Sequence, residues 1–281
     1  MKQVLEHITS RHSLRIKAVL PLSGGDINEV FRIQSSDHEY VLKINQAVRY
    51  PGMFEAEAKG LELLRQSNSF KIPKVIGHDT VATKCYLLME YIPSGNASAN
   101  IWEAFAEALS QLHSQTHQHF GLDHANYIGR LPQANHWQTT AADFYITQRL
   151  EPQFKQASEK GYTFGNLNAF YKVLSEEIPT HRPSLIHGDL WNGNYLIAAD
   201  KNPVLIDPAV AFGSREMDLA MMQLFGGFPK SVFSAYANCA PLEDAWESRI
   251  QLWQLYYVLV HLNLFGSGYL HQVQSILARY S

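Results

Sequence analysis

The sequence has few of the features that assign a chain to a large special class. It holds only two cysteines in 281 residues, Cys85 and Cys239, which is too few for a disulfide framework and suits a reducing compartment. Its 23 Lys and Arg nearly balance its 26 Asp and Glu, so the formal charge is −3, and no run of five like charges occurs. We therefore expect neither nucleic acid nor an anionic membrane as the main partner.

Long apolar runs are also lacking. Residues 1–17 contain no apolar stretch of the length that a signal peptide needs. The most apolar late segment, residues 252–266, is interrupted by Gln254, His261 and Asn263. It falls short of the ~20 apolar residues that cross a bilayer and predicts a buried helix instead. We expect a cytoplasmic protein with no membrane partner; the sequence leaves the oligomeric state open.

The patterns that are present divide the chain in two. The N-terminal third carries short β-branched or alternating runs broken by turn signals, with one helical pattern over residues 53–66. A stretch rich in Pro, Gly, Ser and Asn at residues 93–100 separates it from mostly helical patterns, among which residues 195–207 read as a hairpin. We predict a bilobal α+β fold, with a β-rich N-lobe over 1–92 and an α-rich C-lobe over 93–281.

The segment "IHGDLWNGN" at residues 186–194 concentrates polar side chains. His187, Asp189 and Asn194 form the pattern H-G-D-x-x-x-x-N, and Asp207 follows 18 positions after Asp189. The hairpin between Asn194 and Asp207 would bring both to one edge of a cleft. A polar turn in which Asp and Asn cap backbone groups is the structural alternative. The second aspartate and an upstream lysine favour a catalytic site.

This set of residues suits phosphoryl transfer, which requires an acceptor oxygen held in line with a γ-phosphate and metal ions that neutralise its charge. Asp189 would accept the proton of the acceptor hydroxyl and orient it. Asn194 and Asp207 would give oxygen ligands to Mg²⁺, with ATP as phosphate donor. General-base help contributes roughly 10²–10⁴ in rate, so positioning and charge must supply most of the catalysis.

Residues of the N-lobe complete a nucleotide site. Gly24 and Gly25 lie in a turn whose N–H groups could cover phosphates, although a plain hairpin has the same composition. Lys43, on the third predicted strand, is able to reach the α- and β-phosphates. We predict that Glu57 pairs with Lys43, because Glu55, two positions away, faces elsewhere on the helix.

The segment "LLMEYIP" at residues 87–93 ends the N-lobe. Its backbone could hydrogen-bond an adenine edge, and we place Met89, Glu90 and Ile92 in the nucleotide site, with Met89 shaping the back of the pocket. An ordinary buried strand that leads into a loop would have the same sequence.

With these residues in place the chain resembles the protein-kinase-like fold of small-molecule kinases such as aminoglycoside and choline kinases. More narrowly it resembles the fructosamine kinase (ketosamine-3-kinase) family, on the segments "LSGGDIN", "NYIGRLPQANHW", "LIHGDLWNGN", "IDPAVAFGSREMDLAM" and "HLNLFGSGY". The resemblance implies ATP-dependent phosphorylation of the 3-hydroxyl of ketosamines, the adducts of sugars with amines, and a part in protein deglycation. It makes Asp189 the base. Trp191 would stack on the sugar or pack within the loop.

Some positions depart from the family or serve the scaffold. Phe212 and Ser214 stand where relatives commonly have tyrosine and histidine, so the pocket would differ if those side chains touch substrate. Arg215, Glu216 and Asp218 follow the second aspartate. We expect them to brace the catalytic loop through a buried ion-pair network rather than to contact substrate.

The histidines outside the motif have weaker claims to function. His113 and His117 have the spacing of a metal pair, but only His119 is available as a third ligand, so a metal site there is disfavoured. His261 and Asn263 are predicted to be satisfied polar groups within the α-rich lobe.

Two further functions stay open. The first is a kinase of another small acceptor, such as an aminoglycoside or an amino alcohol, because fold-level likeness does not fix the acceptor. The second is a nucleotide-binding protein without catalysis. The presence of Lys43, Asp189, Asn194 and Asp207 argues against it.

Overall fold

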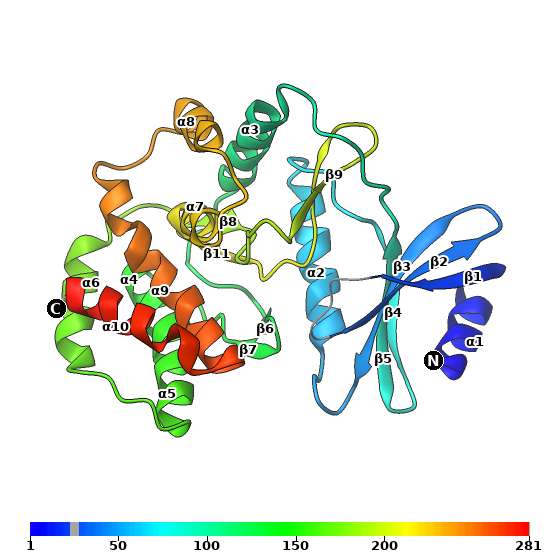
Figure 1. Cartoon of the computed structure of the whole chain (residues 1–281), viewed down its shortest axis with the longest axis horizontal. Coiled ribbons are helices and arrows are strands. Elements are labelled where there is room, and N and C mark those ends of the chain that lie inside the picture. The colour runs from blue at the N-terminus through cyan, green and yellow to red at the C-terminus, as the bar shows by residue number, and fades with distance from the viewer. Residues whose placement is uncertain (23–27, 281) are drawn as a thin grey trace.

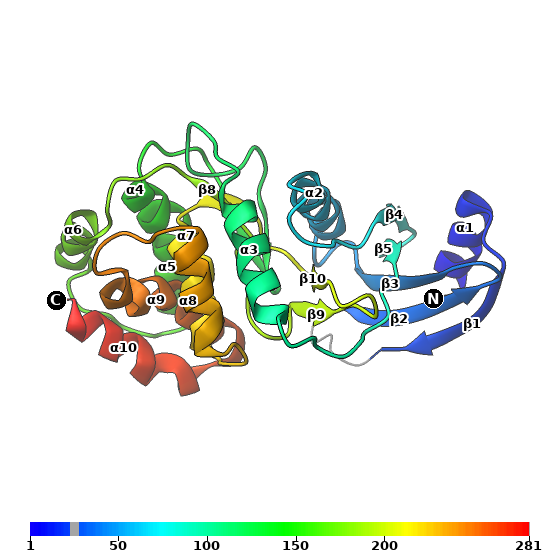
Figure 2. The ribbon, with the colours of Figure 1, turned by 90° about the horizontal axis from the view of Figure 1, so that it is seen from above.

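The computed structural model describes residues 1–22 and 28–280, so the predicted Gly24 and Gly25 lie outside the described residues. These residues form two lobes (Figure 1), with the N-terminus at one end of the molecule and the C-terminus at the other in both views (Figures 1 and 2). The N-lobe holds a five-stranded antiparallel sheet in the order β1-β2-β3-β5-β4. Its strands are β1 (Ile16–Pro21), β2 (Glu29–Ser35), β3 (Glu39–Gln46), β4 (Val75–Val81) and β5 (Lys84–Glu90).

Two helices cover opposite faces of this sheet. Since side chains alternate along each strand, neighbouring residues of one strand pack against different helices. Tyr86 and Leu88 of β5 pack with α1 (Lys2–His12), whereas Leu87 and Met89 pack on the side of α2 (Met53–Gln66). Figure 1 shows α1 on the outer side of the sheet and α2 on the side of the other lobe. The predicted helix over residues 53–66 is confirmed, whereas nothing in the sequence predicted α1.

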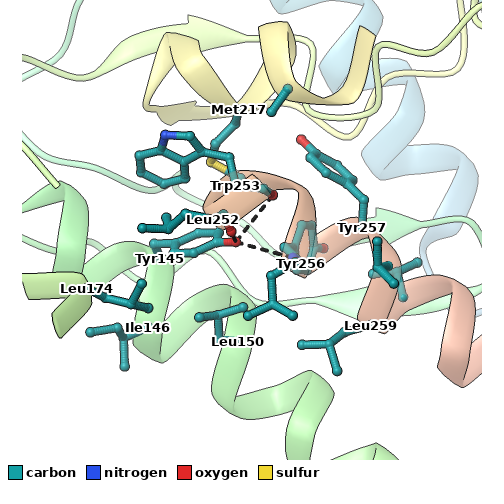
Figure 3. Packing of buried hydrophobic residues seen from close by; sticks show 14 of the residues in the cluster. Tyr145, Ile146, Leu150, Leu174, Met217, Leu252, Trp253, Tyr256, Tyr257 and Leu259 are labelled. Carbon is teal, nitrogen blue, oxygen red and sulfur yellow. Dashed lines mark hydrogen bonds between the residues drawn. The ribbon is translucent and has the colours of Figure 1, made fainter. Parts of the chain in front are cut away.

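The C-lobe is built from helices around one long buried helix. Figure 3 shows Trp253, Tyr256 and Tyr257 of this helix, α9, among the packed side chains of its neighbours. The expected buried helix near residues 252–266 is therefore confirmed. The helices are α3 (Ile101–His113), α4 (Ala141–Tyr145), α5 (Glu151–Glu159), α6 (Leu167–Glu177), α7 (Arg215–Leu224), α8 (Lys230–Cys239), α9 (Trp246–Phe265) and α10 (Leu270–Arg279), with a π-helical turn at Ile146–Leu150 and a 3-10 turn at Ser267–Tyr269.

Short strand pairs hold the loops of the C-lobe. The predicted hairpin over residues 195–207 is confirmed as β9 and β10. A second pair joins β8 to β11, so the chain just before His187 lies beside the chain just after Val210. The pairs are β6 (Asn126–Ile128) with β7 (Leu131–Gln133), β8 (Ser184–Ile186) with β11 (Ala211–Gly213), and β9 (Tyr195–Ile197) with β10 (Pro203–Leu205).

The lobes meet on two sides of a cleft. On one side the Lys71 N–H donates to the Pro203 carbonyl at 3.2 Å, and on the other the Tyr127 hydroxyl donates to the Pro51 carbonyl at 2.9 Å. The expected division at residue 93 falls between Glu90, where β5 ends, and Ile101, where α3 begins, and it stays a prediction. In the described part of the chain, no helix is both long and apolar enough to span a membrane.

Candidate active site

A cavity of about 1030 Å³ opens between the two lobes. It collects side chains from the sheet, the linker after β5, the loops around β9 and β10, and the end of α9. Leu22 and Asn28, which flank the undescribed glycine segment, also line it. Every predicted site residue within the described ranges lines this cavity: Lys43, Glu57, Met89, Glu90, Ile92, Asp189, Trp191, Asn194 and Asp207.

Lys43 is the central cation of the cavity. It projects from β3, is only 4% exposed, and its Nζ donates to Glu57 Oε1 at 2.6 Å and to the Asp207 carboxylate. Burial opposes the charge of Lys43, but the negative charges of Asp207 and Glu57 outweigh it and raise its pKa above the ordinary value. Burial raises the pKa of Glu57, with the Lys43 ammonium acting against it. Glu55 instead bonds Lys59 on the surface, so the choice of Glu57 is confirmed as a contact.

The loop that carries Asp189 is fixed by a buried carboxylate. Asp218, on α7, accepts the N–H of His187 at 2.7 Å and the N–H of Gly188 at 2.8 Å. The His187 ring lies across the loop, with Nε2 2.9 Å from the carbonyl oxygen of Ile206. Because a carbonyl only accepts, Nε2 carries the proton. Asp189 and Asp207 are therefore held on neighbouring backbone segments.

Asp189 and Asn194 are in direct contact. The Asn194 side-chain N–H₂ group donates to the Asp189 backbone oxygen at 2.8 Å and to Asp189 Oδ2 at 3.2 Å. Burial, together with the nearby negative charge of Asp207, raises the pKa of Asp189 to about 7, while the hydrogen bond from Asn194 acts against the rise. A carboxylate of this pKa is well matched to proton transfer near neutral pH.

Asp207 and Asn194 both line the cavity, and Asn194 Nδ2 lies 3.5 Å from the Asp207 backbone oxygen. Asp207 adopts φ +55°, a left-handed conformation uncommon outside glycine, in a segment that the His187 ring holds in place. With the Asn194 nitrogen turned toward Asp189, its amide oxygen stays available. Among the described residues no group of three or more His, Cys, Asp or Glu side chains forms a metal cage. Two oxygen donors beside a phosphate site fit Mg²⁺, which keeps water and phosphate oxygens as its other ligands.

The linker after β5 forms the opposite side of the cavity. The sheet ladder ends where Tyr40 pairs with Glu90, and the Glu90 N–H donates to the Lys74 carbonyl at 2.8 Å. Met89 is buried and lines the cavity, and Ile92 packs with the β9–β10 hairpin. The chain therefore passes along the cavity with its backbone close to the lining.

Trp191 lies at the mouth of the cavity. A Cβ at Gly193 would lie 2.3 Å from Trp191 Cη2, so the indole packs flat on the Gly193 backbone while part of the ring remains exposed. The structure shows the predicted packing within the loop, and stacking on the sugar stays a prediction that the partly exposed ring permits.

Comparisons with known proteins decide the family. The family model described as "Fructosamine kinase" matches residues 1–281. The chain belongs to the fructosamine kinase family. A relative from Lactiplantibacillus plantarum named "Probable ketoamine kinase" is 42% identical over 271 residues, which cover 94% of this chain and 95% of the relative. A "Probable ketoamine kinase" from Synechocystis is 36% identical, covering 96% of this chain and 92% of that one.

Solved structures agree with this family. A candidate fructosamine-3-kinase from Haemophilus somnus superposes with a TM-score of 0.90 at 29% identity, covering 99% of this chain and 97% of that one. One from Thermobifida fusca gives 0.88 at 33% identity, covering 100% and 99%. An aminoglycoside phosphotransferase, at a TM-score of 0.66 and 15% identity, shows the shared fold alone. The predicted bilobal kinase-like fold is confirmed, and this fructosamine kinase is an ATP-dependent phosphotransferase that acts on ketosamines.

The positions where this fructosamine kinase departs from the pattern expected of relatives lie away from the cavity. Phe212 faces His117, at 5.0 Å between ring centroids, and Ser214 Oγ lies 2.9 Å from His181 Nε2. Neither Phe212 nor Ser214 is part of the cavity lining. Phe212 and Ser214 therefore do not contact the cavity directly.

The charged residues after Asp207 brace the fold of the kinase as predicted, but hydrogen bonds to backbone groups take the place of part of the predicted ion-pair network, since Arg215 and Asp218 bond mainly to the backbone. Glu216 is buried against Arg249 at 2.6 Å and accepts the Trp253 indole N–H at 2.7 Å. Arg215 donates to the backbone oxygens of Ala240 and Pro241. Asp218 bonds the loop that carries Asp189. Together these contacts tie α7 to α9 and to that loop.

The remaining histidines divide between scaffold and cavity. His113 is buried between the Tyr236 hydroxyl at 2.7 Å and Asp218 Oδ2 at 3.2 Å, and α3 ends there, so it forms no metal pair with His117. His261 bonds the Tyr257 carbonyl at 2.8 Å, as expected of a satisfied polar group, yet its ring also lines the cavity. The buried Asn263 donates to the Gln153 backbone and side chain, both at 2.9 Å, but its Oδ1 has no partner among the described residues, so the prediction of a satisfied polar group holds only for its N–H₂ group.

Sequence reasoning missed the contribution of α9 to the cavity. The residues concerned are Tyr257, Val260, His261, Leu264 and Phe265. Their spacing of i, i+3, i+4, i+7 and i+8 is the signal of a single helix face. Because α9 is buried on most of its faces, that face could not be singled out from the pattern alone.

Proposed function

We propose that this chain transfers the γ-phosphate of Mg²⁺-ATP to the 3-hydroxyl of the sugar in a ketosamine, with Asp189 as general base. The observation that supports it most is the convergence of Lys43, Asp189, Asn194 and Asp207 on one cavity. These residues come from β3 and from both sides of the β9–β10 hairpin, so only the folded chain brings them together.

The N-lobe side of the cavity would bind the nucleotide. The Lys43 ammonium, held by Glu57 and Asp207, is a fixed positive charge for phosphate oxygens. The backbone of Glu90 and Ile92 would bind the adenine edge, with Met89 behind it, and the segment of Gly24 and Gly25 would cover the phosphates.

Asn194 and Asp207 would hold the magnesium ion through the amide oxygen and the carboxylate. When bound, the ion supplies charge neutralisation on the transferring phosphoryl group. Lys43 would pass from its contact with Asp207 toward the phosphates, since an ion at Asp207 takes up part of that negative charge.

Asp189 would orient the acceptor hydroxyl and take its proton as the phosphoryl group is transferred. The raised pKa of about 7 gives it basicity near neutral pH. Asn194 steadies Oδ2 of this carboxylate, and Asp218 fixes the backbone on which it stands. We further propose a cytoplasmic location, which the two free cysteines suit, and a role in deglycation, which would follow from phosphorylation of ketosamines.

The test is phosphorylation of a defined acceptor panel. Purified protein with Mg²⁺-ATP is incubated with fructosyl-lysine, an aminoglycoside, choline and free fructose, and the products are read by mass spectrometry and ³¹P NMR. We expect one phosphate on the fructosyl-lysine sugar, at the 3-hydroxyl, and none with Asp189→Asn. Turnover of another panel member but of no ketosamine would overturn the proposal. Nucleotide-dependent thermal stabilisation without any turnover would favour the non-catalytic alternative.

A further inference from the structure

One face of α9 forms the wall of the cavity at the end away from the linker. Figure 1 shows the linker after β5 passing over the top of the molecule, whereas the end of α9 lies low, beside β7. The lining residues of α9 run from Tyr257, which is 0% exposed, to Phe265, which is 56% exposed. This stripe therefore leads from the floor of the cavity to its rim.

The inner end of the stripe carries an unused hydroxyl. The Tyr257 side-chain oxygen is buried and has no hydrogen-bond partner in the protein. Figure 3 shows Tyr257 directed to the side of α7, with no dashed line at its oxygen, whereas the Tyr145 hydroxyl is bonded. The neighbouring Tyr256 hydroxyl donates to Gln133 Oε1 at 2.5 Å. Buried hydroxyls are nearly always paired, and within the described part of the chain Tyr257 differs from the similarly unpaired Tyr86 in lining the cavity.

Tyr257 lines the same cavity as the predicted base, Asp189. Burial raises the pKa of Tyr257 well above its ordinary value, and the negative charges of Asp218 and Asp189 raise it further. The group therefore remains a neutral phenol, which both donates and accepts hydrogen bonds. A sugar hydroxyl beside Asp189 is the kind of group that it would pair with.

The outer end of the stripe is aromatic. The Phe225 and Phe265 rings lie 4.7 Å and 5.4 Å from the His261 ring, centroid to centroid. Phe225 and Phe265 are large apolar side chains, yet they are 40% and 56% exposed. Exposed apolar side chains gathered at a cavity rim mark a binding surface.

The charge at this rim favours some substituents over others. Arg130 lines the cavity and donates to the Leu264 carbonyl at 2.7 Å, which leaves its other N–H groups available. Among the described lining residues, Asp189 and Asp207 are the carboxylates outside the N-lobe and the linker. A cationic group at the rim would thus meet Arg130 without an acidic partner.

We propose that this α9 stripe is the acceptor-binding wall, where the Tyr257 hydroxyl bonds the sugar and the Phe225–Phe265 rim takes an apolar substituent on the ketosamine nitrogen. A ketosamine has a polyhydroxylated head and an amine that carries a substituent, and the stripe runs from polar to apolar in the same order. The inference rests on the proposed function and adds the substrate class: ketosamines of apolar amines, in preference to those of polyamines.

The inner part is tested by Tyr257→Phe, with the adjacent Tyr256→Phe as its matched control. Because the Tyr257 hydroxyl has no protein partner, its removal should leave the Tm unchanged and raise the KM for the ketosamine about 3–10-fold, with the KM for ATP unchanged. Tyr256→Phe loses a bond to Gln133, so it should lower the Tm by about 2–4 °C and leave the ketosamine KM unchanged. An unaltered ketosamine KM in Tyr257→Phe overturns the assignment of Tyr257.

The outer part is tested with one sugar on three amines: fructosyl-methylamine, fructosyl-benzylamine and fructosyl-putrescine. We expect wild type to have the highest kcat/KM for the benzyl compound, about 10-fold above the others. Phe265→Ala should remove that advantage, so that its kcat/KM for the benzyl compound falls to its value for the methyl compound. Equal loss on all three, or none, overturns the rim assignment. If wild type phosphorylates no ketosamine at all, the proposed function itself falls.

Discussion

The backbone of Gly188 is in contact with Ala209: a Cβ at position 188 would lie 2.1 Å from the Ala209 carbonyl oxygen. Gly188 also adopts φ +83°, which side chains disfavour. Gly188→Ala should therefore destabilise the protein by more than 2 kcal/mol and displace Asp189, lowering kcat about 100-fold. Urea unfolding and steady-state kinetics measure the two effects.

Gly161→Ala separates the clash from the backbone strain. Gly161 has φ +89°, yet a Cβ there meets nothing within 4 Å. That variant should lose only about 1 kcal/mol of stability and keep its kcat. Equal losses in the two variants would show that the contact with Ala209 has no effect of its own.

Asp218 holds the loop through its charge as well as its shape. Asp218→Asn keeps the volume, but one of its two acceptor oxygens becomes a donor that faces the N–H of His187 or Gly188. Because both N–H groups are buried, we expect a loss of about 2–4 kcal/mol in the free energy of unfolding. The kcat should fall about 10-fold, since Asp189 stands on this backbone. In contrast, Glu62→Gln, which removes a surface pair with Arg65, should change stability by less than about 0.5 kcal/mol.

Local patterns were enough to predict most of the residues that line the candidate site. The helix over residues 53–66 has strong helix formers and ends as predicted, so Glu57 could be chosen over Glu55 by spacing alone. The β9–β10 hairpin follows from its turn residues, and it sets the relation of Asn194 to Asp207. Both features depend on neighbours in the chain.

Contacts between distant segments could not be predicted in this way. The three-residue strands β8 and β11 form by pairing with each other, for example Ile186 with Ala211. No local sequence preference predicts such a pair. α1 buries only Val4 and Ile8, which is a weak pattern in a polar helix. The position of Tyr257 on the cavity wall depends on how α9 is rotated against α7, which a helix with apolar residues on most of its faces does not specify.

Glu57→Gln tests the pair that positions Lys43. The variant loses the charge that faces the Lys43 ammonium and leaves Asp207 as its remaining anionic partner. We expect the KM for ATP to rise and kcat to fall, each about 10-fold, because the ammonium moves away from the phosphates. Glu55→Gln on the exposed side of α2, where Glu55 pairs with Lys59, is the matched control and should behave as wild type. Normal ATP binding in Glu57→Gln would show that Glu57 does not contribute to the nucleotide site.

Asp189 should lower the stability of the metal-free protein at neutral pH. Burial raises its folded-state pKa to about 7, above the ordinary value of 3.8. A carboxyl whose pKa is raised by folding favours the folded state most at low pH, and this contribution is lost as the pH rises from the unfolded pKa through the folded one. Asp189→Asn does not titrate, so its advantage over wild type should grow between about pH 4 and pH 7 and stay constant above.

The measurement is urea unfolding of both proteins in EDTA at pH 4.5, 6.0 and 8.0. Because Asp189 is only half-buried, we expect the variant to be about 1–2 kcal/mol more stable at pH 8.0, less than the full shift implies. The difference should shrink toward zero at pH 4.5, and the variant should have no detectable kinase activity at any pH. A variant less stable than wild type at pH 8.0 would mean that the Asp189 carboxylate stabilises the fold. The expectation that stability is given up for catalysis at this residue would then be wrong.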